Sequence, residues 1–177
     1  PETYSYQFGE SRVDVLQRMS KAMEKVIAKL WSDRKTGLPI SSPFEAVILA
    51  SIVEKETGVR EERSRIAGVF FNRLRRGMRL QSDPTVAYAV TNGKRLLGRS
   101  LTRKDLNAAH PYNTYRIEGL PPGPISNPGR AALVATLNPL ETEELYFVAD
   151  GTGGHSFSKT LAEHNRNVAK WRKLKSD

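Results

Sequence analysis

The segment from Phe44 to Thr57, FEAVILASIVEKET, most constrains how this chain can fold, because a nearly unbroken apolar run ends in two acids, Glu54 and Glu56. Two serines that can cap a helix and a proline suited to a first helical turn precede it at positions 41–43. Gly58 follows, where a glycine commonly ends a helix. The pattern therefore predicts a buried helix that carries carboxyl groups into a poorly hydrated place.

Burial and the negative end of the helix dipole both oppose a charged carboxylate at this end of the helix. Both effects raise the pKa of a glutamate carboxyl group above its usual value of about 4.3 and favour the protonated acid. A general acid must be in this state when it meets its substrate. The end of this predicted helix is thus a candidate position for a catalytic acid.

Glu54 and Glu56 cannot serve one substrate atom together, because side chains two positions apart on a helix point about 200° apart. Glu56 continues an apolar stripe that includes Leu49 and Val53, whereas smaller and more polar residues precede Glu54. The periodicity favours Glu56 only weakly, since the helix is apolar nearly all round. In the alternative interpretation both acids are solvated end residues, paired with arginines of the following segment, 60–65.

The chain has 177 residues, which suits one well-cored domain, and it contains no cysteine. Disulfides, thiolate metal sites and a cysteine nucleophile are therefore excluded. His110, His155 and His164 lack metal-ligand spacing and no GxSxG motif is present, so we expect no metal site and no serine triad. No apolar run reaches the roughly 18 residues of a membrane span and no signal-peptide pattern opens the chain, so a soluble fragment is expected.

The net charge of +9 indicates attraction to an anionic partner, which could be nucleic acid, an anionic membrane surface or an acidic polymer such as a bacterial wall. Many basic residues lie in segments with helical patterns, 60–79 and 159–175, where a solvated helix face explains them without a partner. No phosphate-binding glycine loop, zinc-finger spacing or aromatic RNA-binding signature is present. We therefore expect no nucleic-acid partner.

Between Gly77 and Asn127 the apolar periodicity fades and Gly, Pro, Asn and Tyr become frequent. This stretch is expected to be a long functional loop region with short strands at 78–80 and 115–117. An apolar strand at 145–149 and a hairpin partner at 155–158 flank a glycine-rich turn. The predicted fold class is α+β with helices dominant, and the expected helices are 11–31, 43–57, 61–76, 130–137 and 161–174.

Several motifs stand out in this framework and follow one another in a fixed order. They are IVEKET (52–57), LQSDPTV (80–86), YNTY (112–115), GLPPGPISNPG (119–129), YFVADGTGGHSF (146–157) and LAEHN (161–165). Taken together, they closely resemble the endolytic murein transglycosylase family, also called YceG-like, over most of the chain. The resemblance is specific, because several motifs of five or more residues recur with similar spacing.

The resemblance implies a bacterial lytic transglycosylase that cuts internal MurNAc-GlcNAc β-1,4 bonds of peptidoglycan glycan strands and leaves 1,6-anhydro-MurNAc ends. It implies a mainly helical, lysozyme-like catalytic domain in which the long loop-rich segment forms the cleft. No cofactor or metal is implied. The partners that it implies are peptidoglycan glycan strands, with peptidoglycan synthases as further candidates.

Family members usually carry an N-terminal transmembrane helix and a LysM-like region before the catalytic part. This chain contains neither, so residues 1–177 are expected to form a single catalytic domain. The full-length protein would act at the extracytoplasmic face of the bacterial inner membrane, in the periplasm. Contact with the membrane would be made only through the missing anchor.

In the family motif the catalytic acid is the second Glu of EKE, which corresponds to Glu56. One carboxyl group suffices for the implied reaction: it protonates the glycosidic oxygen and then takes the proton of the MurNAc C6 hydroxyl, which attacks C1. Polar residues of the loop region are the candidates for substrate binding, although each could instead be a turn residue that bonds its own backbone, and the last of them a helix cap. These candidates are Gln81, Ser82, Asp83, Tyr112, Asn113, Thr114, Tyr115 and Asn127.

Two alternative functions remain open at this point. A muramidase would hydrolyse the same bond with water and release reducing ends. A non-catalytic module that binds the cell wall or nucleic acid would account for the basic charge, but it would give the motifs no role.

Overall fold

The computed structural model describes residues 2–174. This part of the chain folds into a mainly helical body with one small antiparallel sheet, which confirms the predicted α+β class. In chain order the elements are α1 (Arg12–Ser32), α2 (Pro43–Glu56), the short 3₁₀ helix η1 (Arg60–Glu62), α3 (Arg63–Arg75), α4 (Asp83–Thr91), α5 (Arg103–Asn107), α6 (Arg130–Leu137), β1 (Tyr146–Ala149), β2 (His155–Ser158) and α7 (Leu161–Leu174).

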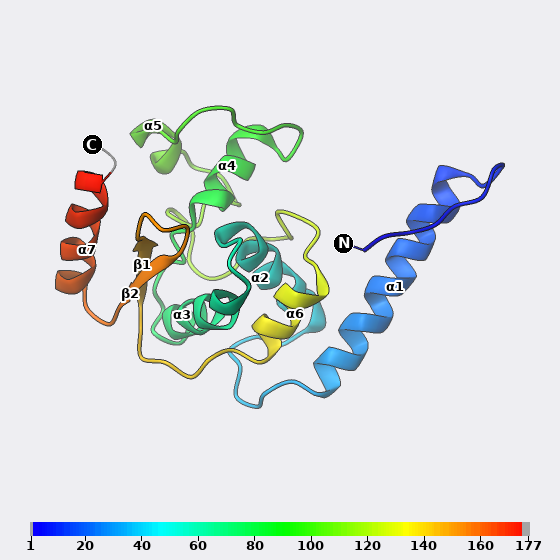
Figure 1. Ribbon diagram of the computed structural model, residues 1–177, viewed down its shortest axis with the longest axis horizontal. Coiled ribbons are helices and arrows are strands. Elements are labelled where there is room, and N and C mark those ends of the chain that lie inside the picture. Colours follow the sequence, from blue (N-terminus) through cyan, green and yellow to red (C-terminus); the bar gives the residue numbers. More distant parts are fainter. Residues whose placement is uncertain (1, 175–177) are drawn as a thin grey trace.

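Helix α2 lies at the centre of the molecule, where it packs against α1, α3, α4 and α6 (Figure 1). Its start follows the sequence signals, because the Ser42 hydroxyl accepts a hydrogen bond from the backbone N–H of Glu45 at 3.2 Å and Pro43 lies in the first turn. Leu49 and Ile52 are fully buried. Burying one such side chain stabilises the fold by about 1.5–3 kcal/mol, so α2 is a firmly held central element.

The end of α2 differs from the expected glycine cap. Thr57 is extended, with φ −139° and ψ 138°, and Gly58 does not adopt a left-handed conformation. The Thr57 hydroxyl instead accepts a hydrogen bond from the Val59 N–H at 3.0 Å and donates one to Glu62 Oε2 at 3.2 Å. A turn stabilised by a side chain therefore ends the helix immediately after Glu56.

The other strongly periodic segments also form helices close to their predicted limits. The one difference of type is at the start of the predicted helix 61–76, where the short η1 precedes α3. Two apolar clusters form the core around these helices. One joins α2 to α3 and the other joins α2 to α1 and α6; the first contains Leu49, Ile52, Val53, Ile66, Phe70 and Phe71, and the second Leu30, Ala46, Ala50, Ala132, Leu133 and Leu137.

The predicted hairpin at the C-terminal side is confirmed. Strands β1 and β2 pair antiparallel, with Tyr146 opposite Ser158 and Ala149 opposite His155. Helix α7 packs on both strands, and the Asn167 amide donates a hydrogen bond to the Ser158 hydroxyl at 3.0 Å. In Figure 1 the hairpin lies between α3 and α7, so it connects the last helix to the central body.

The prediction for residues 77–127 was partly wrong, because this stretch contains α4 and α5 and no strand. Residues 78–80 have no partner strand, and the carbonyls of Arg79 and Leu80 accept hydrogen bonds from the Arg73 side chain instead. Residues 115–117 lie in a turn, in which the N–H groups of residues 116 and 117 both donate to the Asn113 carbonyl. A side chain in the first segment and a local turn in the second thus bind backbone groups that a sheet would otherwise have paired.

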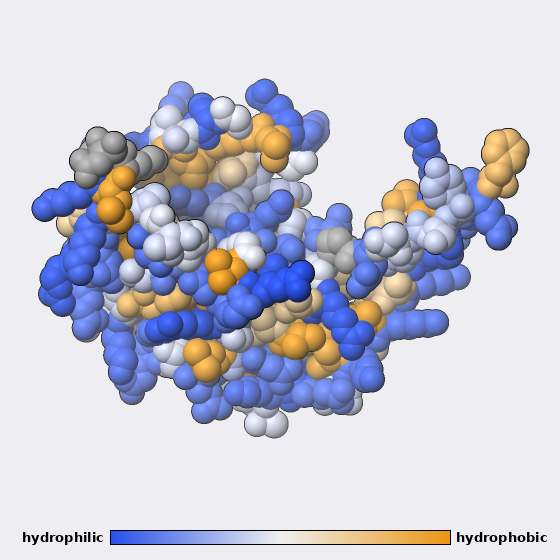
Figure 2. Space-filling view, viewed as in Figure 1, coloured by the Kyte–Doolittle hydropathy of each residue, from blue (hydrophilic) through white to orange (hydrophobic). Residues whose placement is uncertain are grey.

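Helix α1 reaches the body with its C-terminal part, and its N-terminal part projects away from the other helices (Figure 1). Leu30 near its end is buried, whereas Val13 and Leu16 near its start are 59% and 61% exposed. Figure 2 shows apolar side chains as separate patches on a largely hydrophilic face, several of them along α1. Within residues 2–174, no helix combines the length and the apolar character needed to cross a membrane.

The connection between α6 and β1 lies unusually close to α3. Leu140 N–H donates to the Ser64 carbonyl at 2.9 Å, and the Asn72 amide donates to the Thr142 carbonyl at 2.7 Å. This approach requires a glycine at Gly68, since a Cβ atom there would lie 2.4 Å from the Leu140 carbonyl oxygen. The side of the molecule that holds the hairpin therefore depends on this glycine.

Gly68→Ala is predicted to destabilise the protein by about 1–3 kcal/mol, because the backbone of the connection must move to admit the methyl group. Gly58→Ala is the matched control, since nothing lies within 4 Å of its Cβ position, and it should change stability by no more than about 0.5 kcal/mol. Urea denaturation of both variants measures the difference. Equal stability of Gly68→Ala and the unsubstituted protein would show that the connection is not held against α3.

Candidate active site

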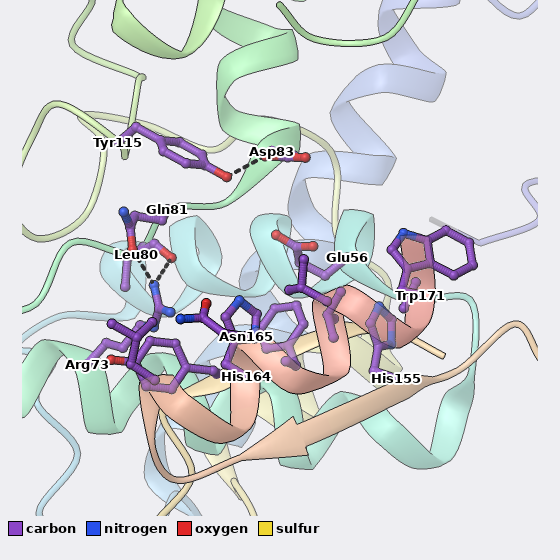
Figure 3. Close-up of a pocket in the computed structure, with 16 residues that line it drawn as sticks. Glu56, Arg73, Leu80, Gln81, Asp83, Tyr115, His155, His164, Asn165 and Trp171 are labelled. Atoms are coloured by element: carbon purple, nitrogen blue, oxygen red, sulfur yellow. Dashed lines mark hydrogen bonds between the residues drawn. The ribbon is translucent and has the colours of Figure 1, made fainter. Parts of the chain in front are cut away.

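Glu56 opens onto a cavity of about 560 Å³ at the end of α2. Its walls come from α3, from the segment 80–83, from Tyr115, from β1 and from α7. In Figure 3, Arg73 and Gln81 lie at one end of the cavity, His155 and Trp171 at the other, and Glu56 between these ends. A volume of this size accommodates a ligand as large as a few sugar units.

The Glu56 side chain is partly buried, and its pKa is raised to about 7. Burial is the largest cause, and the nearby negative charge of Asp83 raises the pKa further. A hydrogen bond donated by the Ser82 hydroxyl to Glu56 Oε1 and the charge of Arg73 act in the opposite direction. The carboxyl group is therefore about half protonated near neutral pH, which suits a group that donates and then accepts a proton.

Glu54 faces another part of the molecule, as the helical spacing predicts. Its Oε2 atom accepts a hydrogen bond from the Gly129 N–H at 3.0 Å, at the start of α6. Neither Glu54 nor Glu56 forms an ion pair with an arginine of segment 60–65 within residues 2–174, and Arg65 pairs with Glu144. Because Glu54 binds a backbone N–H group and burial raises the pKa of Glu56, the alternative of two solvated end residues is wrong.

Ser82 is held in place by a buried network of hydroxyl groups. Its N–H donates to Thr114 Oγ1 at 3.0 Å, and its carbonyl accepts from Thr85 Oγ1 at 2.6 Å. The two threonine hydroxyls lie 2.8 Å apart and both residues are fully buried. Gln81, just before Ser82, has a φ of 51°, a conformation that residues other than glycine adopt rarely. Together these features fix the Ser82 hydroxyl against the Glu56 carboxyl group.

Asp83 and Tyr115 form a pair on the cavity wall, with the Tyr115 hydroxyl donating to Asp83 Oδ1 at 2.6 Å (Figure 3). Burial, followed by this hydrogen bond, raises the pKa of Tyr115, so the phenol remains neutral and keeps its proton. The second oxygen of Asp83, Oδ2, accepts no hydrogen bond within residues 2–174 and is available to a ligand.

The fold therefore brings together around Glu56 four of the candidate residues that the sequence predicted, namely Gln81, Ser82, Asp83 and Tyr115. The remaining candidates, Tyr112, Asn113, Thr114 and Asn127, do not line this cavity. Their environments explain why.

Asn113 is fully buried, and its amide donates to the carbonyls of Leu106 and Ala108 at 3.1 Å and 2.8 Å. Thr114 belongs to the hydroxyl network behind Ser82, so it acts on the site only through the backbone. The side chains of Asn113 and Thr114 thus form hydrogen bonds with backbone groups of the protein.

Tyr112 and Asn127 lie elsewhere. The Tyr112 ring packs on Tyr88, with centroids 4.7 Å apart, beside the core. Asn127 is exposed near α1, and the cap of α6 is Gly129 rather than Asn127. The helix-cap role suggested for Asn127 is therefore wrong, and Asn127 does not line the cavity at Glu56.

Sequence reasoning missed the wall formed by α3, β1 and α7. Arg73 was assigned to a solvated helix face, but it is only 8% exposed and borders the cavity. His164, Asn165 and Trp171 approach from α7, which is remote in sequence. Burial, and next the charge of Arg73, lower the pKa of His164, so its ring is neutral at pH 7. The motifs YFVADGTGGHSF (146–157) and LAEHN (161–165) were the available signals for the parts of this wall that β1 and α7 form.

His155 joins the rim of the cavity to the end of α2. Its Nδ1 atom lies 2.7 Å from Glu62 Oε2, and its backbone N–H donates to Glu62 Oε1 at 2.8 Å. Glu62 also accepts the hydrogen bond of Thr57. This contact ties β2 to the turn that follows Glu56.

Comparison with known proteins finds one family whose members match this chain over nearly its whole length. The model of the YceG-like family matches residues 1–170. A protein of Bacillus subtilis (strain 168) named endolytic murein transglycosylase is 37% identical over 178 residues, which cover 100% of this chain and 48% of that protein. A protein of the same name from Streptococcus pneumoniae (strain D39) is 38% identical over 176 residues, which cover 96% of this chain and 31% of that protein.

A crystal structure of a YceG-like protein from Listeria monocytogenes superposes with a TM-score of 0.82 and 43% sequence identity, covering 94% of this chain and 53% of that one. The chain therefore spans about half or less of the length of the curated relatives that it matches.

The raised pKa of Glu56 predicts a specific dependence of stability on pH. The folded state holds this proton more tightly than the unfolded chain, in which the pKa is near 4.5. The resulting stabilisation is complete below about pH 4.5 and is lost as the pH rises to 7. Above pH 7 the buried carboxylate destabilises the fold by about 1–3 kcal/mol relative to a neutral side chain.

Glu56→Gln keeps the shape of the side chain and its acceptor for Ser82, but it cannot ionise. Its free energy of unfolding should match that of the unsubstituted protein near pH 4 and exceed it by about 1–3 kcal/mol at pH 8. Urea denaturation across this range measures the gap between the two proteins. A gap that does not change with pH would be inconsistent with a buried, titrating Glu56.

Proposed function

The chain belongs to the YceG-like family, and from this premise we propose that it is the catalytic part of an endolytic peptidoglycan lytic transglycosylase. The proposed substrate bond is the internal MurNAc-GlcNAc β-1,4 bond of glycan strands, and the proposed product carries a 1,6-anhydro-MurNAc end. The single observation that carries the proposal is Glu56, a carboxyl group with a pKa of about 7 that opens onto a cavity large enough for sugars.

In the first step Glu56 acts as the general acid. Because Ser82 donates its hydrogen bond to Oε1, the carboxyl proton resides on Oε2 and is free to reach the glycosidic oxygen. The proton passes to that oxygen as its bond to MurNAc C1 breaks. The leaving strand departs with a new hydroxyl group, and Glu56 becomes a carboxylate.

In the second step the same carboxylate acts as the base. It takes the proton of the MurNAc C6 hydroxyl while the C6 oxygen forms a bond to C1, which closes the anhydro ring and restores the protonated acid. No water is consumed, because the substrate supplies the nucleophile. One carboxyl group whose pKa lies near the working pH can perform both transfers.

Asp83 is suited to stabilise the positive charge that develops at C1. It is a second carboxylate in the cavity, oriented by Tyr115, and its free oxygen can face the sugar ring. Preorganised groups of this kind lower the barrier without moving during the reaction.

Asp83 is also the observation that favours the second candidate function. A muramidase acting on the same bond needs one carboxyl group as acid and another as base or nucleophile, and Asp83 could fill the second role. The two functions differ in their products, since hydrolysis adds one water to the new end.

The charge and the family premise together support an extracytoplasmic site of action. A net charge of +9 favours contact with wall polymers that carry carboxylates and phosphates. We propose that residues 1–177 act as one catalytic domain on glycan strands, with peptidoglycan synthases as candidate partners and the extracytoplasmic face of the inner membrane as the location of the whole protein.

Mass analysis of the muropeptides released from purified peptidoglycan tests the reaction. The proposal predicts ends that are lighter than reducing ends by one water, and reducing ends would support the muramidase instead. Glu56→Gln should lower the rate of release by at least about 100-fold, because the proton donor is lost.

Glu54→Gln is the control, since this residue lies two positions away on the same helix and binds Gly129 rather than the cavity. It should retain nearly full activity. Comparable losses in the two variants would count against Glu56 as the sole acid and base.

A further inference from the structure

The Arg73 end of the cavity contains hydrogen-bond donors that the protein itself does not use. Arg73 Nε donates to the Leu145 carbonyl at 2.6 Å, and Nη1 donates to the Leu80 carbonyl at 2.9 Å and to Gln81 Oε1 at 3.2 Å. These bonds fix the guanidinium plane between α3, β1 and the segment before Ser82. The guanidinium group is therefore bonded to both of these segments.

The second terminal nitrogen of Arg73, Nη2, has no hydrogen-bond partner in residues 2–174. Within the same residues, the fully buried side-chain atoms that lack a hydrogen-bond partner belong to Arg63, Thr136 and His164. Arg73 Nη2 is not among them, so this atom is accessible to solvent. Arg73 is 8% exposed and lines the cavity, so the accessible part of the guanidinium faces the cavity. Two N–H groups are therefore available there.

Neighbouring side chains add to this donor set. Because Gln81 Oε1 already accepts from Arg73, the amide NH₂ of the exposed Gln81 remains to donate. His164 and Asn165 approach the same end from α7 (Figure 3). The Arg73 guanidinium and the His164 ring both pack against Tyr146, each 5.2 Å from its ring centroid. We call Arg73, Gln81, His164 and Asn165 the donor corner.

Among the residues that the structure describes, Arg73 has no carboxylate in direct contact, although the charge of Glu56 acts on it electrostatically. Arg73 takes part in none of the ion pairs found between residues 2 and 174, and its hydrogen-bond partners are neutral carbonyl and amide oxygens. A largely buried guanidinium without a carboxylate is unusual, because burial of a charge is costly unless it is paired. A bound acceptor, above all an anionic one, would satisfy it.

We propose that the donor corner binds the acyl oxygens of the 3-O-lactyl group of MurNAc, through Arg73 Nη2 and the Gln81 amide. This inference rests on the proposed function. Of the substituents along an alternating MurNAc-GlcNAc strand, the lactyl group alone occurs on one sugar type only, and it ends in a carboxylate or, where a peptide stem is attached, in an amide carbonyl. The fork of an arginine matches either acceptor.

Recognition of the lactyl group would set the register of the strand. The acetamido group occurs on both sugars, so contacts to it cannot distinguish them. A contact to the lactyl oxygens places MurNAc, rather than GlcNAc, at a fixed distance from Glu56. The donor corner is thus a specificity site for the bond that is cut.

Binding to the Glu56→Gln protein tests the inference without turnover. The probes are glycan oligomers of equal length: a strand with free lactyl carboxylates, the same strand with those carboxyls reduced to alcohols, and a chitin oligomer. Calorimetry should show that reduction weakens binding by about tenfold or more, as loss of a charged hydrogen bond would, and that the chitin oligomer binds as weakly as the reduced strand.

Equal affinity for the carboxylate strand and its reduced form would overturn the inference. Binding to none of the three oligomers would instead contradict the proposed function. The two failures are therefore distinguishable.

A second binding experiment varies the protein instead of the ligand. Arg73→Lys in the Glu56→Gln background keeps the charge but removes the fork, and it should weaken binding of the carboxylate strand while leaving the chitin oligomer nearly unaffected. Arg75→Lys, on the same helix and outside the cavity, is the control and should change neither affinity. An equal loss for both ligands in folded Arg73→Lys would overturn the inference. If this variant does not fold, the ligand comparison decides alone.

Discussion

The burial of one carboxyl group at the end of an apolar helix is the constraint on which the rest of this structure depends. Helix α2 is apolar on nearly every side because it is surrounded by four other helices. Glu56 is its last residue, so it leaves the core at the point where the cavity begins. The low polarity of that position raises the pKa of Glu56, and Ser82 donates a hydrogen bond to one of its two oxygens. The place where α2 ends thus determines both the position of Glu56 and its raised pKa.

The cavity around Glu56 is assembled from segments that are far apart in the chain. Arg73 of α3 binds backbone carbonyls on both the segment before Ser82 and Leu145, the residue just before β1, so one side chain aligns two walls. The third wall, α7, reaches the cavity through the β1–β2 hairpin. The central helix and the last helix of the chain therefore meet at the site where the proposed chemistry takes place.

Much of this arrangement could be predicted from the sequence, and the failures have physical reasons. Periodic apolar spacing identified α1, α3 and α7, and the two-residue offset correctly separated Glu54 from Glu56. Helix α4 was missed because it is short and apolar on most sides, so it has little periodicity. Arg73 was missed because an arginine in a helix is usually solvated, and its burial depends on carbonyls of residues 80 and 145 that no local pattern reveals.

The loop candidates illustrate the same limit. Asn113 and Thr114 have side chains suited to binding sugars, but they satisfy backbone groups and hold Ser82 in place. Composition indicates that a polar side chain has a partner, and only tertiary structure decides whether the partner is a ligand or the protein.

The central claim is that Glu56 holds its proton near neutral pH because of where α2 ends. NMR titration of the protein labelled with ¹³C at the glutamate carboxyl carbons measures this directly, with Glu56→Gln identifying the resonance. We expect a pKa of about 7 for Glu56. We also expect a higher value in Ser82→Ala, because the hydrogen bond from Ser82 lowers this pKa. A Glu56 carboxyl group that titrates near 4.5 in both proteins would contradict this claim.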